Sequence, residues 1–204
     1  MHIAILTFEG FNELDSLIAL GVLNRAAPKL RVSLATPTPQ VTSMNGVTLQ
    51  GHITLEDAAG ADAVLVGSGI QTRTIIKDAA MMARLQLDPA RQLIAAQCSG
   101  ALILAKLGLL SHGEACTDLT TAPWLQALGI RPLQTPLHVQ GSIATAGGCL
   151  ASVYLAGWLI SRLIDEPATA AALHYMAPVG EKESYVAHAL ALLRQADTGQ
   201  QVVS

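Results

Sequence analysis

The sequence predicts an α/β protein in which helices cover both faces of a mostly parallel sheet. Of its 204 residues, 51% are hydrophobic, 13% are charged and 3% are aromatic. This composition is typical of a core of Val, Ile, Leu and Ala with strands buried on both faces. Short apolar runs of strand length also alternate with segments of helical periodicity. We find no repeat, linker or second core, so we expect one domain at 1–196 and a flexible tail at 197–204.

The first half of the chain alternates predicted strands and helices. In order, we expect a strand at 2–7, a helix at 14–25, a strand at 31–35, a hairpin of 41–44 and 47–50, a strand at 63–66 and a helix at 78–87. The hairpin rests on Asn45-Gly46, the strongest short hairpin signal in the chain. Gly67-Ser68-Gly69 follows a strand but is not a dinucleotide-binding motif. It indicates a backbone that closely approaches another group.

The second half continues the alternation and ends in helices. We expect strands at 93–96, 113–117, 131–133 and, as a pair, around 139 and at 142–145, with helices at 101–110, 123–128, 149–164, 167–176 and 181–195. The segment 149–164 is the most apolar of these, but it is too short to span a bilayer. We expect it to be a core helix.

The stretch from 92 to 110 carries the main candidate for chemistry. An apolar strand runs directly into an Ala- and Leu-rich helix, so residues 97–100 must turn the chain sharply. Cys98 lies at this turn, at the N-terminus of a helix, where unpaired N–H groups favour negative charge. A thiolate is stabilised there, so we expect a lowered pKa and a nucleophilic sulfur. This arrangement is the thiol version of a nucleophile elbow.

The other cysteines have a simpler interpretation. A cysteine in an apolar segment is more often an inert small hydrophobe, and we expect this for Cys116 and Cys149. Three cysteines cannot all pair, and they lack the close spacing of a zinc site. We therefore expect no metal, no cofactor and a reduced, cytoplasmic setting. No basic segment typical of a signal peptide precedes the first strand.

Two carboxylates and one histidine are candidate partners for Cys98. Glu13 and Asp15 follow the first strand, and acidic residues commonly stabilise a helix N-terminus. Ligands, however, bind outside the carboxyl ends of parallel strands, where either carboxylate would face Cys98. The six histidines show no metal-ligand spacing, and none is an obvious partner for Cys98. Only His138, which lies on the approach to the last predicted strand pair, is a candidate to lie near it. Without a histidine base, a thiolate with a nearby carboxylic acid suits addition to a small electrophile.

The overall charge excludes some partners. The net charge of −3 provides no basic surface for nucleic acid and no polybasic patch for anionic lipid. We therefore expect neither nucleic acid nor membrane as a partner. So few charged residues also favour burial of part of the surface against another subunit.

Four motifs in this order resemble the ThiJ/PfpI superfamily of class I glutamine amidotransferase-like proteins. They are FEGFNELD, VGSG, QCSGALILAKLGLL and TAGGC. The resemblance covers nearly the whole chain. It implies a flavodoxin-like three-layer sandwich and a homodimer.

Within this superfamily, the chain looks most like isonitrile hydratases and the amidotransferase-like sensor domains of AraC-type regulators. The resemblance implies that Cys98 is the nucleophile and that Asp15 is the acid that hydrogen bonds its thiolate. It places Ser99 where hydratases have threonine, with backbone N–H groups around Gly69 and Ile70 as oxyanion donors. Asp118 stands where protease-like and many hydratase-like members carry histidine, so peptidase activity is not expected.

Three functions remain open at this stage. The first is a small-molecule hydratase or lyase that converts an isonitrile to an N-substituted formamide. The second is a glyoxalase or deglycase that acts on 2-oxoaldehydes through a hemithioacetal. The third is not enzymatic: an exposed, acidic thiol would act as a redox sensor, or the cleft would bind a ligand.

Overall fold

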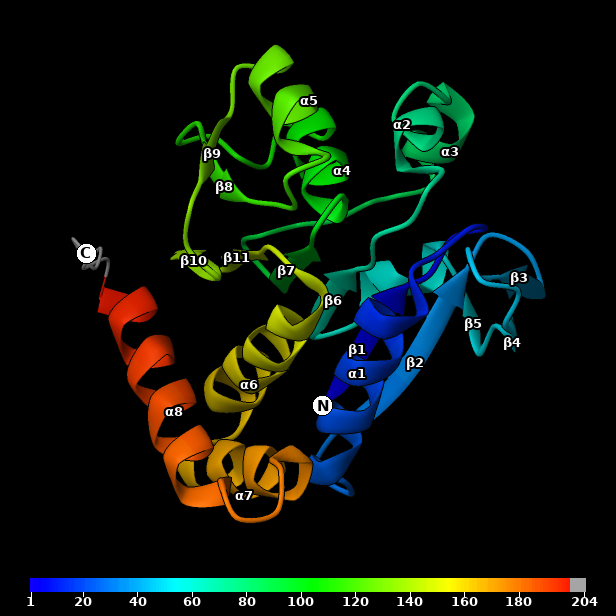
Figure 1. Ribbon diagram of the computed structural model, residues 1–204. Coiled ribbons are helices and arrows are strands. Elements are labelled where there is room, and N and C mark those ends of the chain that lie inside the picture. Colours follow the sequence, from blue (N-terminus) through cyan, green and yellow to red (C-terminus); the bar gives the residue numbers. More distant parts are fainter. Residues whose placement is uncertain (199–204) are drawn as a thin grey trace.

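A seven-stranded sheet forms the centre of the protein in the computed structural model, which describes residues 1–198 (Figure 1). The strands lie in the order β10-β11-β7-β6-β1-β2-β5. All neighbours are parallel except β10, which is antiparallel to β11. The strands are β1 (His2–Leu6), β2 (Arg31–Thr36), β5 (Ile53–Thr54), β6 (Ala63–Val66), β7 (Leu93–Gln97), β10 (Leu137–Gln140) and β11 (Ile143–Ala146). The predicted α/β class with a mostly parallel sheet is confirmed.

The central strands are apolar on both faces because each face supports its own core. Along β1, Ile3 and Ile5 join one hydrophobic cluster, whereas Ala4 and Leu6 join the other. This alternation follows the two-residue period of a strand. The composition of the sequence predicted such doubly buried strands.

Helices cover the two faces in separate groups. Figure 1 shows α1 (Glu13–Leu23) and α6 (Ser152–Leu163) on one side, with α7 (Glu166–Met176) and α8 (Lys182–Thr198) further out. The other side carries α4 (Gly100–Lys106), with α2 (Thr72–Ile75), α3 (Ala79–Ala83) and α5 (Ala122–Ala127). Two small ribbons complete the fold: the antiparallel pair β3 (Gln40–Thr42) and β4 (Thr48–Gln50), and the parallel pair β8 (Glu114–Cys116) and β9 (Arg131–Leu133). No helix within residues 1–198 has the length and apolar character needed to cross a membrane.

Several helices differ from their predicted bounds for identifiable reasons. The helix expected at 78–87 forms only over α3, capped by the Asp78 carboxylate, and the short α2 before it was not predicted. The helix expected at 101–110 ends at Lys106, shortly before Gly108 adopts φ +73°. A left-handed glycine commonly ends a helix.

The C-terminal helix is longer than predicted. It continues through Asp197 and Thr198, and the indole N–H of Trp158 donates to Asp197 Oδ1 at 3.2 Å. This bond ties the last turn to α6. The remainder of the predicted tail, 199–204, lies outside the described residues.

The parallel strands bring the candidate residues to one edge of the sheet. Because β1, β6, β7 and β11 run in the same direction, their carboxyl ends lie together. The segments that leave these ends contain Asp15, Ser68, Cys98 and Cys149. Ligands of open α/β sheets bind at this edge.

Candidate active site

Cys98 occupies a tight turn between β7 and α4. Its φ is +46°, and it is the only non-glycine residue with positive φ in the described part of the chain. Such a conformation costs on the order of 1–3 kcal/mol and persists only where the surroundings enforce it. The Cys98 N–H donates to the Ala146 carbonyl at 2.8 Å, and its carbonyl accepts from Thr117 Oγ1 at 2.8 Å. Two neighbouring segments therefore hold the turn in place.

Glycine is required at two positions that press against this turn. A Cβ on Gly100 would lie 2.5 Å from the Val66 carbonyl oxygen, and a Cβ on Gly147 would lie 2.2 Å from that of Thr117. Both obstacles are backbone atoms, which cannot move aside. The glycines of the CSG and TAGG motifs thus allow the ends of β6, β7, β8 and β11 to approach one another.

Asp15 places a buried carboxyl beside the Cys98 sulfur. Asn12 caps α1 by accepting from the Leu14 N–H at 3.1 Å, which fixes the helix start. Asp15 follows in the first turn and has no exposed surface. Its Oδ2 accepts a hydrogen bond from the Ser68 hydroxyl. Its Oδ1 has no hydrogen-bond partner among the described residues.

Burial raises the pKa of the Asp15 carboxyl, and nearby donors partly oppose that rise. The largest opposing effect is the hydrogen bond from Ser68, followed by the thiols of Cys149 and Cys98. Both thiols therefore lie beside this carboxyl, although neither makes a hydrogen bond of normal geometry to Oδ1. The arrangement is a buried carboxyl group with two thiols beside it.

The expected lowering of the Cys98 pKa is wrong. Burial raises the pKa of this thiol, whose residue is only 4% exposed, and the negative charge of Asp15 raises it further. A hydrogen bond from the backbone of Gly148 opposes these effects without overcoming them. The sequence suggested the helix terminus but gave no measure of burial, and desolvation of the thiolate dominates.

Cys98 and Asp15 are best treated as one proton-holding pair. Each group disfavours ionisation of the other, and burial disfavours both anions. The pair therefore retains at least one proton at neutral pH. Internal transfer of that proton from sulfur to carboxylate creates a thiolate without adding net charge to the site.

The predicted oxyanion donors make specific bonds of their own. The Gly69 N–H donates to Ser99 Oγ at 3.2 Å, and Thr72 Oγ1 lies 2.9 Å from the same oxygen. The Ile70 N–H donates to the Gly10 carbonyl at 3.0 Å, so it is occupied. The Ser99 N–H has no acceptor within the described residues, and it belongs to the residue directly after Cys98.

Two other residues that the sequence suggested for the site, Asp118 and Glu13, differ in their relation to Cys98. Asp118 accepts from the Thr121 N–H at 2.9 Å, and its charge still raises the pKa of Cys98. Glu13 instead turns to the β3–β4 hairpin, where its Oε1 accepts from Asn45 Nδ2 at 2.7 Å.

His138 lies on the edge strand β10, which β11 separates from β7 and Cys98. It is half-buried, and burial lowers its pKa, with smaller effects of opposite sign from Glu114 and Arg131. No histidine is among the groups that shift the pKa of Cys98. A histidine base is therefore not part of this arrangement.

Two residues that the sequence did not single out complete the site. Gln97 Nε2 donates to the Cys98 sulfur at 3.5 Å and to the Gly148 carbonyl at 2.8 Å. The sulfur of Cys149 accepts from Asn12 Nδ2 at 3.2 Å. Cys116 is fully buried, as expected of an inert small hydrophobe, whereas Cys149 is partly exposed. The TAGG motif directly before Cys149 was the feature of the sequence that could have indicated that Cys149 lies at the site.

A pocket of 440 Å³ adjoins the turn. Thr117, Asp118, Pro136 and Gly148 are among its lining residues. It meets Cys98 through Thr117 and Gly148, which both hydrogen bond to that residue. No cluster of metal-ligating side chains is found within residues 1–198.

The fold and this edge of the sheet define a flavodoxin-like α/β protein with a cysteine at the carboxyl end of a central strand. The family model described as DJ-1/PfpI matches residues 1–161. The chain therefore belongs to the DJ-1/PfpI family, as its motifs predicted.

Individual relatives agree with this assignment. The isonitrile hydratase of Pseudomonas putida is 26% identical over 166 residues, which cover 80% of this chain and 72% of that protein. The structure of a ThiJ/PfpI family protein from Pseudomonas syringae has a TM-score of 0.77 at 19% identity, covering 97% of this chain and 89% of the other. Schizosaccharomyces pombe DJ-1 has a TM-score of 0.75 at 13% identity, covering 87% and 100% respectively. At these identities the two structures establish the fold.

Proposed function

We propose that this protein is a small-molecule hydratase that converts isonitriles to N-substituted formamides. The observation that carries the proposal is the buried Asp15 carboxyl beside the Cys98 thiol, with no histidine acting on the sulfur. Both groups hold their protons more tightly than usual. This suits a reaction that needs a nucleophile and a proton donor together.

Isonitrile hydration begins with addition of the thiol to the terminal carbon. The Cys98 sulfur bonds to that carbon, and its proton passes through Asp15 to the same carbon, giving a thioimidate. Water then adds to the carbon while the nitrogen takes a proton. Cleavage of the carbon–sulfur bond releases the formamide and restores the thiol. One water is consumed and no net proton is lost.

The raised pKa of Asp15 is useful in this sequence. A general acid works best when its pKa lies near the operating pH, and an ordinary aspartate is too acidic. Ser68 holds one carboxyl oxygen and leaves Oδ1 for the transferred proton. We assign the Ser99 N–H as donor to oxygen in the tetrahedral intermediate, with Gly69 positioning the Ser99 side chain.

The 440 Å³ pocket supports a small organic substrate. Its lining includes Leu119, Leu133 and Pro136 beside Asp118. An uncharged isonitrile suits a mixed, mostly apolar wall that contains a carboxylate. The similarity to the Pseudomonas putida isonitrile hydratase gives further support.

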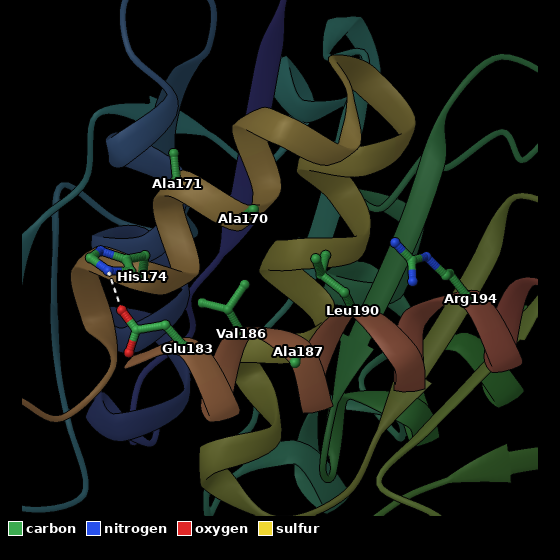
Figure 2. Close-up of a pocket in the computed structure, with 8 residues that line it drawn as sticks. All are labelled: Ala170, Ala171, His174, Glu183, Val186, Ala187, Leu190 and Arg194. Atoms are coloured by element: carbon green, nitrogen blue, oxygen red, sulfur yellow. Dashed lines mark ion pairs between the residues drawn. The ribbon is translucent and has the colours of Figure 1, made fainter. Parts of the chain in front are cut away.

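We also propose a homodimer through the outer face of α7 and α8. A groove of 630 Å³ lies between them, lined in its middle by Ala170, Val186, Ala187 and Leu190 (Figure 2). Figure 2 shows Val186 and Leu190 projecting from α8 toward α7.

The order of residues along α8 allows a second copy as the occupant of this groove. If two α8 helices pair antiparallel, Ala187 faces Leu190 across the two-fold axis. The charged residues at the two ends already have partners within the chain, because Arg194 pairs with Glu166 and Glu183 lies 3.8 Å from His174. The apolar middle of the groove is therefore the part that a second copy would cover.

We make two further proposals, on the domain organisation and on the location of the protein. We propose that residues 1–196 form a single domain, because both hydrophobic clusters pack on the same sheet. We propose a cytoplasmic location because the three cysteines are free thiols.

The decisive experiment is turnover of an aryl and an alkyl isonitrile, with formamide followed by NMR. Wild-type protein is expected to turn over, whereas Cys98→Ala abolishes the reaction and Asp15→Asn lowers kcat at least about 100-fold, as expected for loss of acid–base catalysis. Glu13→Gln is the matched control and should retain activity. Wild type that leaves both isonitriles intact would overturn the proposal.

Methylglyoxal consumption by the same proteins distinguishes a glyoxalase or deglycase from the proposed hydratase. Cys98-dependent consumption of methylglyoxal without isonitrile turnover would replace the hydratase with that reaction.

A further inference from the structure

Cys149 is a thiol that the hydratase chemistry leaves unused. It lies directly after the glycine turn of β11 and is partly exposed, whereas Cys98 is almost fully buried. Burial and the charge of Asp15 raise the pKa of the Cys149 thiol. Its sulfur is oriented by the Asn12 side-chain amide at 3.2 Å. A buried hydrophobe would need no such bond.

Three contacts link Cys98 to Cys149 or to the loop that carries Cys149. Both sulfur atoms lie beside the Asp15 carboxyl, whose Oδ1 is buried without a partner. The backbone of Gly148, the residue before Cys149, hydrogen bonds to the Cys98 sulfur. Gln97 joins the Cys98 sulfur to the Gly148 carbonyl. The loop that carries Cys149 is thus tied to Cys98 from two sides.

We propose that Cys98 and Cys149 form a redox-active pair that closes to an intramolecular disulfide when the protein meets a hydroperoxide. Formation of this disulfide does not depend on isonitrile turnover. Cys149 is the resolving cysteine, and it protects Cys98 from irreversible oxidation.

The chemistry balances in two steps. The Cys98 sulfur attacks one peroxide oxygen, the O–O bond breaks, and an alcohol or water leaves with the thiol proton, giving a sulfenic acid. The Cys149 sulfur then attacks the Cys98 sulfur, the S–O bond breaks, and water leaves with the second thiol proton. The two cysteines are oxidised by two electrons and the hydroperoxide is reduced by two.

Asp15 is placed to move both protons. Both thiols lie beside its carboxyl, so it accepts the proton of the attacking thiol and returns it to the departing oxygen. Cys116 is excluded from the pair because it is fully buried on β8, with its sulfur 3.3 Å from Thr135 Oγ1.

The test is intact-mass analysis and peptide mapping of reduced full-length protein treated with hydrogen peroxide, followed by alkylation in denaturant. Wild type should lose about 2 Da before alkylation, and the map should join Cys98 to Cys149. Dithiothreitol should restore all three alkylation sites. In Cys149→Ser and Cys149→Ala, Cys98 should instead gain two oxygens as sulfinic acid.

Cys116→Ser is the matched control and should form the same disulfide as wild type. Cys149→Ser keeps a hydrogen-bonding group for Asn12, so it separates loss of the thiol from loss of local structure. Equal accumulation of Cys98 sulfinic acid in wild type and Cys149→Ser would overturn the proposal. A disulfide found only between chains, or one that includes Cys116, would overturn it as well.

Discussion

The Ser68 hydroxyl donates a hydrogen bond to Asp15 Oδ2, and both side chains are buried at the carboxyl edge of the sheet. This bond favours the charged carboxylate, whereas burial favours the neutral acid. The balance between these two effects sets the pH at which Asp15 gives up its proton.

Replacing Ser68 with alanine therefore shifts the pH dependence of the proposed reaction. Loss of the donor raises the pKa of Asp15 further, so the acid remains protonated to higher pH. The falling limb of kcat/KM against pH should move upward in Ser68→Ala. Ser33→Ala, which removes a buried hydroxyl that bonds His2, should leave the profile unchanged. A shift toward lower pH would contradict the assignment of Asp15 as acid.

Asp15 also makes the fold less stable at neutral pH. Its folded-state pKa is raised by burial, so the stability that the protonated carboxyl contributes is fully present below the unfolded-state pKa of about 3.9 and is lost as pH rises through the folded-state value. Asp15→Asn does not titrate. At pH 7 it should be more stable by about 1 kcal/mol, or about 2–4 °C in Tm. Thermal melts should show this difference shrinking toward pH 4; a constant difference would exclude titration of Asp15 as its cause.

The rate of Cys98 alkylation reports the charge of Asp15. Because the carboxylate raises the pKa of the thiol, Asp15→Asn should increase the fraction of thiolate and speed alkylation by iodoacetamide near neutral pH. Glu13→Gln removes a carboxylate that faces Asn45 instead, so its rate should match wild type. Peptide mapping separates Cys98 from the other thiols. A slower reaction in Asp15→Asn would contradict the charge effect.

Gly100→Ala tests the close approach at the turn. The added Cβ would lie 2.5 Å from the Val66 carbonyl oxygen, and such overpacking costs about 1–3 kcal/mol. Gly21→Ala in α1 meets no atom within 4 Å and should stabilise the helix by about 0.5–1 kcal/mol. Urea denaturation measures both. Equal effects of the two substitutions would show that the contact is not rigid.

Leu190→Glu tests the proposed dimer face. A charge in the middle of the α7–α8 groove should convert a dimer to a monomer in size-exclusion chromatography with light scattering. Leu128→Glu changes an exposed leucine that follows α5 on the other side of the sheet, and it should leave the dimer intact. A wild-type protein that is monomeric at all concentrations would reject the proposal.

Much of the fold followed from periodicity. The runs at β1, β6 and β7 are doubly buried and uninterrupted, so their class and their order with the helices were predictable. Short elements were not, because α2 is held by contacts with α4 rather than by a signal in its own four residues. Helix ends depended on single glycines such as Gly108.

The site was only partly predictable for a different reason. The turn at Cys98 and the acidic helix start were visible in the sequence, but their burial was not. Burial reverses the expected shift of the Cys98 pKa. The choice of Asp15 over Glu13 depends on which side of one helical turn faces the sheet. The contribution of Cys149 required the meeting of loops that lie far apart in the chain.

The start of α1 contacts four separate segments of the chain through three residues. Asn12 holds Cys149, Glu13 holds the β3–β4 hairpin, and Asp15 meets the GSG loop and Cys98. Substitutions at Asn12 and Asp15 should therefore be strongly epistatic, because a small rotation of this turn moves both side chains relative to Cys149, Ser68 and Cys98. These two residues constrain the geometry of the site although neither bonds covalently to a substrate.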